Sequence, residues 1–261
     1  MISDDGCQYV HPYYPEGVKH ILTTGGNHYI GFVDENTILK YPHFKVPWPA
    51  LDVESLIYKQ LGKHDSIIGF KGKHEEGVLL EYAPKGSLYN YIADTGLTGL
   101  TEHEKIRLAR EIAEGVAHAH SRSVIICNIN LRNVLLDDAL HAKLCGFQGR
   151  LLGPDGKVLH DGGSCELADS FMPRQDNFSA SFVTDIFALG STVYHIMTGH
   201  EPFPELDVFK DEAEFRRRYQ QGHFPPMDTL LAGKVILGCW KGEYASAGKV
   251  AEDLSLLETR F

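Results

Sequence analysis

The segment Ile126-Cys-Asn-Ile-Asn-Leu-Arg-Asn-Val-Leu-Leu-Asp-Asp-Ala-Leu-His-Ala-Lys-Leu-Cys-Gly-Phe-Gln148 carries the pattern on which the predicted fold depends. Within it, Val134–Leu136 and Ala142–Leu144 are two short apolar runs, and Asp137 and Asp138 between them are typical turn residues. The pattern predicts a short β-hairpin, with a polar segment before it and a glycine-containing segment after it.

Helical patterns lie on both sides of this hairpin. The residues Thr101-Glu-His-Glu104 have the composition of a capping box, and an apolar stripe with helical spacing follows them as far as His120. Residues 184–199 are apolar on nearly every face of a helix, so we expect this helix at the centre of a core. Between the two, Pro154-Asp-Gly156 predicts a turn that joins two short strands, Leu151-Leu152 and Val158-Leu159.

The first third of the chain has mainly strand-like patterns. Residues 50–61 form the one amphipathic helix expected there, and Gly62 follows at the C-cap position. Four β-branched or aromatic runs are expected to be strands: 29–33, 37–41, 67–70 and 78–82. The chain is therefore predicted to be α+β and bilobed, with a small β-rich lobe, a hinge near residues 81–86 and a larger α-helical lobe.

Composition excludes several classes of protein. The 261 residues include 25 basic and 35 acidic side chains, and a net charge of −10 argues against binding nucleic acid or an anionic membrane surface. Hydrophobic residues make up 43% of the chain, which excludes wholesale disorder. Five cysteines without a C-x-x-C pair are typical of reduced thiols. With no signal-peptide pattern in residues 1–6 and no long apolar run, we expect a cytoplasmic protein.

The order of these patterns resembles a eukaryotic protein kinase domain. Residues 128–137 resemble the catalytic loop of that family, and Gly146-Phe-Gln148 occupies the place of its metal-binding D-F-G. Asp185-Ile-Phe-Ala-Leu-Gly190 resembles the start of its buried core helix. The resemblance implies one kinase-like domain, with an N-terminal extension at 1–19, an N-lobe at 20–83 and a C-lobe at 84–261.

The resemblance also implies that catalytic groups are missing. Asn128 lies where the family has its catalytic Asp, and an amide has neither the basicity nor the charge of a carboxylate. Asn130 replaces the Lys that steadies the transferred phosphate, and Gly146 replaces the metal-binding Asp. Asn133 alone remains of the metal-binding pair, so Mg²⁺ is not expected to bind. The chain looks like a degenerate kinase, a pseudokinase.

The glycine-rich loop that would hold nucleotide phosphates is incomplete in either of two registers. One register places Gly25 on the middle glycine of the family's G-x-G-x-x-G, with Thr23 and His28 on the outer two. The other places Gly26 and Gly31 on the outer positions and His28 on the middle one. In either register His28 would crowd the approach of phosphates to the backbone.

Other positions of the nucleotide site are carried over from the family as remnants. Ile38 replaces the small residue above the adenine, and Lys40 and Glu54 are expected to form the family's strand-to-helix ion pair. The remaining remnants lie at the gatekeeper, the hinge and the floor of the cleft: Leu80, Glu81, Ala83 and Leu135. We expect any binding of ATP to be weak and no other cofactor to be required.

Structural positions of the family are better matched. Ile126, Phe147 and Tyr58 are expected to form a continuous apolar stack, and Asp185 is expected to bind the backbone of the catalytic loop. The family's ion pair at the end of the activation loop is expected to be missing. Neither a Glu near residues 171–174 nor an Arg near residues 246–247 is present to form it.

Three functions remain open on this basis. The first is a non-catalytic module that binds protein partners, such as an active kinase or a kinase substrate, as scaffold, decoy or allosteric partner. The second is a weak, atypical phosphotransferase that uses Lys40 and Asn133. The third is a sensor that binds ATP without turnover.

Overall fold

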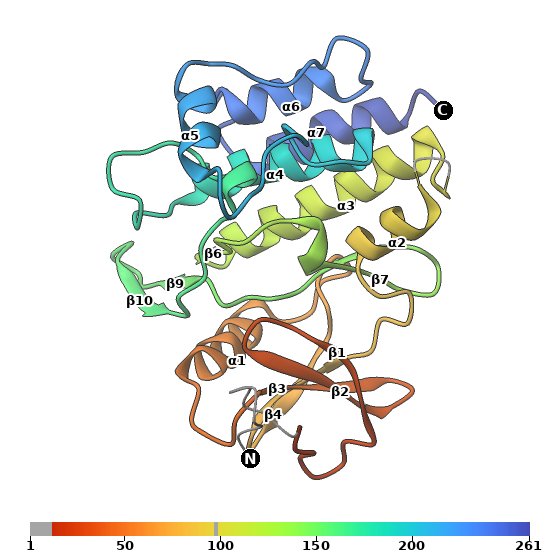
Figure 1. Ribbon diagram of the computed structural model, residues 1–261, viewed down its shortest axis with the longest axis vertical. Helices are drawn as coiled ribbons and strands as arrows, with labels where there is room; N and C mark the ends of the chain where they lie inside the picture. Colours follow the sequence, from red (N-terminus) through yellow and green to blue (C-terminus); the bar gives the residue numbers. More distant parts are fainter. Residues whose placement is uncertain (1–11, 97–98) are drawn as a thin grey trace, which may run out of the picture.

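A five-stranded antiparallel sheet forms the small lobe of the computed structural model, which describes residues 12–96 and 99–261 (Figure 1). The strand order is β1-β2-β3-β5-β4. The strands are β1 (His20–Thr24), β2 (His28–Asp34), β3 (Thr37–Pro42), β4 (Phe70–His74) and β5 (Gly77–Glu81). The expectations that concern residues 1–6, Cys7 and the first part of the N-terminal extension lie outside the described residues.

Helix α1 (Pro49–Leu61) packs against β4 and β5 and faces the large lobe (Figure 1). Proline favours the first turn because its missing N–H would have no partner there. The backbone N–H of Gly62 caps the helix by bonding to Tyr58 O, and Gly62 has a φ of 66°. The predicted helix and its end are confirmed.

The strand predicted at residues 67–70 is wrong. Strand β4 begins only at Phe70, and Ile67 and Ile68 are buried without belonging to the five-stranded sheet. The N–H of Ile68 donates to Leu144 O over 2.9 Å, and the N–H of Leu144 donates to Ser66 O over 2.8 Å. This apolar run is buried because it connects the two lobes, a contact that local sequence periodicity does not encode.

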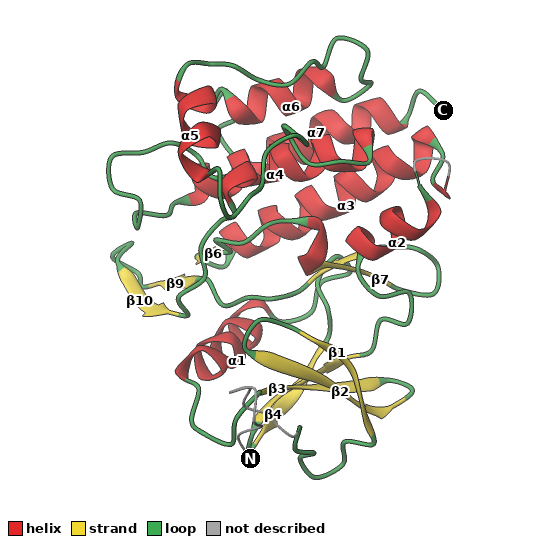
Figure 2. Ribbon diagram, in the orientation of Figure 1, coloured by secondary structure: helices red, strands yellow, loops and turns green. Residues whose placement is uncertain are grey.

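Helices build most of the large lobe (Figure 2). They are α2 (Leu88–Thr95), α3 (Glu102–Ser121), α4 (Phe182–Thr198), α5 (Glu212–Gln220), α6 (Gly233–Trp240) and α7 (Ala247–Glu258). Helix α4 contacts α3 and α6 and is buried along nearly its whole length, as predicted from its apolar faces. The capping box of α3 at Thr101 and Glu104 is also confirmed.

None of the helices in residues 12–96 and 99–261 is long and apolar enough to cross a membrane.

Helix α2 was not predicted from the sequence. Only Leu88 and Ile92 of this helix are buried, and two buried positions do not establish a helical period. The hydroxyl of Ser87 accepts from Asn90 N over 3.2 Å and caps the helix start. The chain therefore crosses to the large lobe between Glu81, where β5 ends, and this short helix.

Two small sheets lie between the helices of the large lobe and α1. Strands β7 (Val134–Leu136) and β8 (Ala142–Leu144) form the predicted hairpin. Strands β9 (Arg150–Leu152) and β10 (Val158–Asp161) form the second predicted hairpin around Asp155, and β9 also pairs with β6 (Val124–Ile125). The segment after Gly146 is thus attached to the backbone that precedes residue 126.

We expect this second hairpin to protect its amides from hydrogen exchange. The N–H of Leu152 donates to Ser123 O over 2.9 Å, and the N–H of Gly153 donates to Lys157 O over 2.8 Å. Hydrogen–deuterium exchange followed by mass spectrometry should therefore give slow exchange over residues 150–161. Exchange at the rate of an unfolded peptide throughout that range would contradict the structure of this segment.

Candidate functional site

The carboxylate of Asp185, in the first turn of α4, fixes the backbone that carries the candidate site. Its Oδ2 accepts from Ile126 N over 2.7 Å, and its Oδ1 accepts from Cys127 N over 2.9 Å. Asp185 has no exposed surface, and Cys127 has a φ of 63°, a conformation that is rare for a side chain other than glycine. The contact expected of Asp185 is present, and it holds Cys127 in an unfavourable conformation.

A third partner of Asp185 was not foreseen. His120, in the last turn of α3, donates from Nε2 to Asp185 Oδ2 over 3.0 Å, and its ring lies 4.5 Å from that of Phe182. A buried carboxylate is stable only when its oxygens are hydrogen-bonded. His120 was noted only as the end of the helical stripe, because its spacing gives no sign of a contact 65 residues away.

Three asparagine side chains meet in the polar segment before β7. Asn130 Nδ2 donates to Asn128 Oδ1 over 2.6 Å, and Asn133 Nδ2 donates to the backbone oxygen of Asn128 over 3.0 Å. Asn130 Oδ1 also accepts from Arg132 N over 2.9 Å. These three positions, which the resemblance assigns to catalysis and metal binding, therefore form a cluster of neutral side chains in which Asn130 and Asn133 both bond to Asn128.

Gly146 faces this amide cluster. It has a φ of 75°, and a Cβ placed on it would lie 2.9 Å from Asn133 Oδ1. The position therefore offers no oxygen ligand and little space for one. Mg²⁺ requires carboxylate or phosphate oxygens with nearly octahedral geometry, so this set of donors does not fit it. Within residues 12–96 and 99–261, no group of three or more His, Cys, Asp or Glu side chains could hold a metal ion.

The expected ion pair between β3 and α1 is present. Lys40 Nζ lies 2.7 Å from Glu54 Oε2 and 3.0 Å from Glu54 Oε1. The side chains of both residues are nearly inaccessible to solvent, with 7% and 0% exposed. A buried pair of this kind depends on both partners, because removal of one leaves an uncompensated charge.

An aromatic stack connects α1 to the segment after Gly146. The Tyr58 ring lies edge-on to Phe147 at a centroid distance of 5.3 Å and is stacked parallel on Phe70 at 5.7 Å. Ile126 is buried in the same apolar cluster. The Tyr58–Phe147 contact of the expected stack is therefore present, and Phe70 extends it; the place of Ile126 in the stack remains a prediction. Burial also raises the pKa of the Tyr58 hydroxyl and raises that of the Cys145 thiol to about 12, so neither group ionises at neutral pH.

Apolar residues occupy four of the positions that the resemblance assigns to the adenine side of the nucleotide cleft. Ile38 lies opposite Leu80 in the β3–β5 register, and both side chains are buried. Ala83 belongs to the same cluster, and Leu135 packs against it. Glu81 is used structurally, because its Oε2 accepts from Gly69 N over 2.9 Å.

The glycine-rich loop forms the tip of the β1–β2 hairpin. The N–H of Gly25 donates to His28 O over 2.8 Å, and Gly26 lies exposed between them. The imidazole of His28 lies against Gly25 so closely that a Cβ on Gly25 would overlap it. The His28 ring therefore lies beside the glycine backbone that it was expected to crowd.

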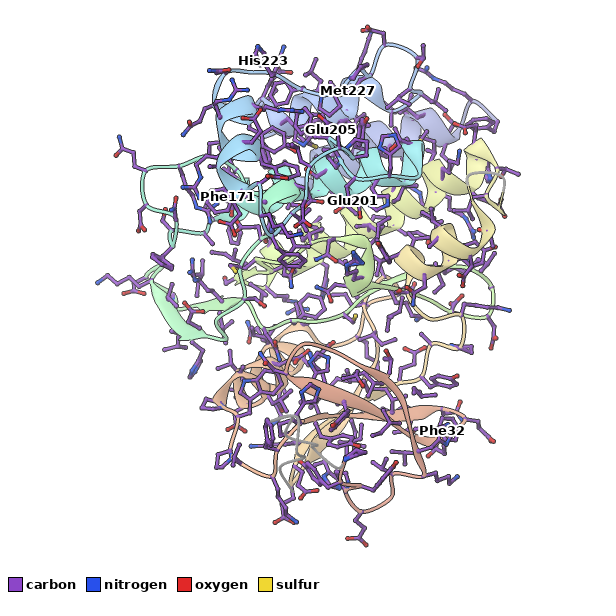
Figure 3. The ribbon with its side chains drawn as sticks, in the orientation of Figure 1. Phe32, Phe171, Glu201, Glu205, His223 and Met227 are labelled. Atoms are coloured by element: carbon purple, nitrogen blue, oxygen red, sulfur yellow. The ribbon has the colours of Figure 1, made fainter. Side chains whose placement is uncertain are left out.

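A different ion pair stabilises the segment that precedes α4. Arg174 Nη2 lies 3.0 Å from Glu166 Oε2, and both side chains are largely buried. The guanidinium groups of Arg174 and Arg216 lie over the Phe171 ring, at 4.1 Å and 5.0 Å from its centroid. Figure 3 shows Phe171 in the large lobe near α5. The segment end is therefore held by an ion pair of its own and by a contact with Arg216 of α5, an arrangement that motif matching at residues 171–174 did not reveal.

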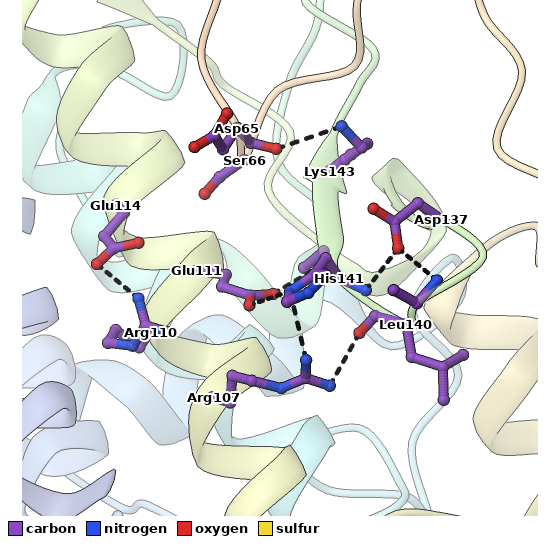
Figure 4. Close-up of polar contacts among 12 residues, drawn as sticks. Asp65, Ser66, Arg107, Arg110, Glu111, Glu114, Asp137, Leu140, His141 and Lys143 are labelled. Atoms are coloured by element: carbon purple, nitrogen blue, oxygen red, sulfur yellow. Dashed lines mark hydrogen bonds and ion pairs between the residues drawn. The ribbon is translucent and has the colours of Figure 1, made fainter. Parts of the chain in front are cut away.

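A polar network attaches the β7–β8 turn to α3 (Figure 4). The buried carboxylate of Glu111 accepts from His141 Nδ1 over 2.7 Å and from Ala142 N over 2.8 Å. Arg107 Nη2 donates to Leu140 O over 3.1 Å, and Asp137 Oδ1 accepts from His141 N over 2.9 Å. The hairpin that separates Asn133 from Gly146 is thereby held in one position.

Comparison with known proteins finds similarity to protein kinases over most of the chain. A family model described as "Protein tyrosine and serine/threonine kinase" matches residues 50–251. The probable serine/threonine-protein kinase KCC4 of Saccharomyces cerevisiae is 27% identical over 236 residues, which cover 84% of this chain and 21% of that protein. The probable serine/threonine-protein kinase PBL4 of Arabidopsis thaliana is 28% identical over 218 residues, which cover 74% of this chain and 52% of that protein.

A shorter match has higher identity. The serine/threonine-protein kinase GIN4 of Saccharomyces cerevisiae is 33% identical over 135 residues, which cover 50% of this chain and 11% of that protein. The chain thus spans 52% or less of the length of each of these three relatives.

We expect Asp185→Ala to lower the free energy of unfolding by about 3–5 kcal/mol, because two buried N–H groups lose their acceptor. Asp185→Asn keeps one carbonyl oxygen and should cost less. Urea denaturation followed by circular dichroism measures both variants. A loss below about 1 kcal/mol in the alanine variant would contradict the anchoring role.

We expect Gly146→Ala to destabilise the protein more than Gly156→Ala does. The two glycines have φ values of 75° and 76°. In each variant the alanine must therefore adopt a left-handed backbone conformation, which costs about 1–2 kcal/mol. Only Gly146 faces another group, because nothing lies within 4 Å of a Cβ at Gly156. Thermal denaturation compares the two variants, and equal losses would show that Asn133 does not restrict this position.

Proposed function

Because the chain belongs to the protein tyrosine and serine/threonine kinase family, we propose that it is a member without normal phosphotransfer activity that acts by binding other proteins. Its role would be that of a scaffold, a decoy or an allosteric partner of an active kinase. The observation that carries this proposal is the cluster of Asn128, Asn130 and Asn133 beside Gly146. Phosphoryl transfer by kinases requires a carboxylate in the catalytic loop and another on the metal ion.

The amide cluster and Gly146 supply neither of these two carboxylates. Asn128 has no useful basicity, and loss of a general base typically lowers the rate by about 10²–10⁴. Its side-chain oxygen already accepts from Asn130. At Gly146 no carboxylate is present, so the usual position of Mg²⁺ lacks its anionic ligand.

The non-catalytic parts of the fold support a binding role, because they are complete without a ligand. The Lys40–Glu54 pair, the Tyr58–Phe147 stack and the Asp185 contacts are all formed between groups of the chain itself. These buried contacts fix the backbone without a ligand, so recognition of a protein partner would require little ordering of the chain. The net charge of −10 favours a partner with a basic surface and disfavours nucleic acid.

An ATP-binding sensor without turnover is the second candidate. The observation that favours it is the intact pair of Lys40 and Glu54, since this lysine contacts nucleotide phosphates in active kinases. Thermal denaturation with ATP, with and without Mg²⁺, separates the two candidates. An unchanged midpoint supports the pure binding module, and a metal-independent increase supports the sensor.

We expect no transfer of phosphate from radiolabelled ATP to the chain itself or to casein, histone or myelin basic protein. The assay is run with Mg²⁺ and with Mn²⁺, and Lys40→Ala defines the background. Lys71→Ala, at an exposed lysine of the same sheet, is the matched control. Stoichiometric labelling by the wild type that Lys40→Ala abolishes and Lys71→Ala retains would overturn the proposal in favour of a weak phosphotransferase.

A further inference from the structure

His28 lies on the face of the small-lobe sheet that carries Lys40. In the β2–β3 register, Ile30 lies opposite Lys40 and His28 lies opposite Pro42. Directly opposed residues in an antiparallel pair share a face, and residues two positions apart on one strand also share it. The side chains of His28 and Lys40 are therefore diagonal neighbours on this face, where Lys40 reaches Glu54.

The imidazole of His28 is held in place from several sides. It lies against the backbone of Gly25, and it is stacked on the indole of Trp48 with a centroid distance of 6.0 Å and an interplanar angle of 21°. The backbone oxygen of His28 accepts from Gly25 N and lies 2.9 Å from His43 Nε2. The stacking brings the tip of the β1–β2 hairpin against Trp48, the residue before α1, and Figure 1 shows this hairpin beside α1.

The ring is uncharged in this position. Burial first, and then the nearby charge of Lys40, lower the pKa of His28 to about 3. A neutral imidazole contributes no charge attraction to a phosphate. Backbone N–H groups at such a glycine-rich turn are free to approach phosphates only when no side chain covers them.

We propose that His28, held by Trp48, fills the space between Gly25 and Lys40 in which the phosphates of a nucleotide would lie, and so closes the cleft of this chain against nucleotides. Trp48 immediately precedes the first residue of α1. A ligand that displaced His28 would therefore also release the residue that leads into α1. The inference rests on the proposed function, because a cleft that transferred phosphate would have to admit ATP.

The test compares the wild type with His28→Ala by isothermal titration with two probes, metal-free ATP and inorganic tripolyphosphate. Only molecules with an open cleft bind the probe, so the apparent affinity falls in proportion to the fraction that is open. We therefore expect His28→Ala to bind both probes on the order of tenfold more tightly than the wild type. His20→Ala removes an exposed imidazole from β1 of the same hairpin and should bind as the wild type does. The Trp48 emission spectrum should also change in His28→Ala.

Trp48→Ala provides a second measurement, because it leaves His28 in place but removes its stacking partner. We expect this variant to bind tripolyphosphate more tightly than the wild type and less tightly than His28→Ala. Equal dissociation constants for the wild type and both variants overturn the closure by His28. Labelling of substrate by the wild type overturns the proposed function instead, so the two failures are distinguishable.

Discussion

The structure of the candidate site depends on one buried carboxylate. Asp185 accepts from two successive backbone N–H groups and from His120, and these bonds hold Cys127 at a positive φ. A charged group without exposed surface is stable only when such partners surround it, so the carboxylate and the loop stabilise each other. Because Asp185 lies at the start of the most buried helix, the loop is tied to the centre of the large lobe.

The side chains at the loop positions that the family uses for catalysis carry no charge. The chain has 35 acidic side chains, yet the loop positions that the kinase family uses for acid–base and metal chemistry are Asn128, Asn133 and Gly146. Asn133 donates to the backbone oxygen of Asn128, and Gly146 adopts a left-handed conformation that faces Asn133. The surplus of acidic residues therefore supplies no carboxylate at these three positions.

Much of the fold could be predicted from local patterns, and the errors have a common cause. The capping box at Thr101, the apolar helix at 184–199 and the two hairpins of the large lobe were predicted because each depends on residues close together in the chain. Residues 67–70 were misassigned because their burial comes from contacts with β8 in the other lobe. The ion pair of Glu166 with Arg174 was missed because it replaces a pairing that the family makes between different positions.

The sequence by itself determined which functional groups are available. No fold can supply a carboxylate at residue 128 or 146, because the side chain there is an amide in one case and absent in the other. Only the tertiary structure decided how the remaining groups are used. His28 lies against Gly25 and Trp48, and Lys40 reaches Glu54, because strand pairing and the packing of α1 on the sheet bring distant residues together. Such contacts depend on the arrangement of whole elements, which residue identity and local spacing do not specify.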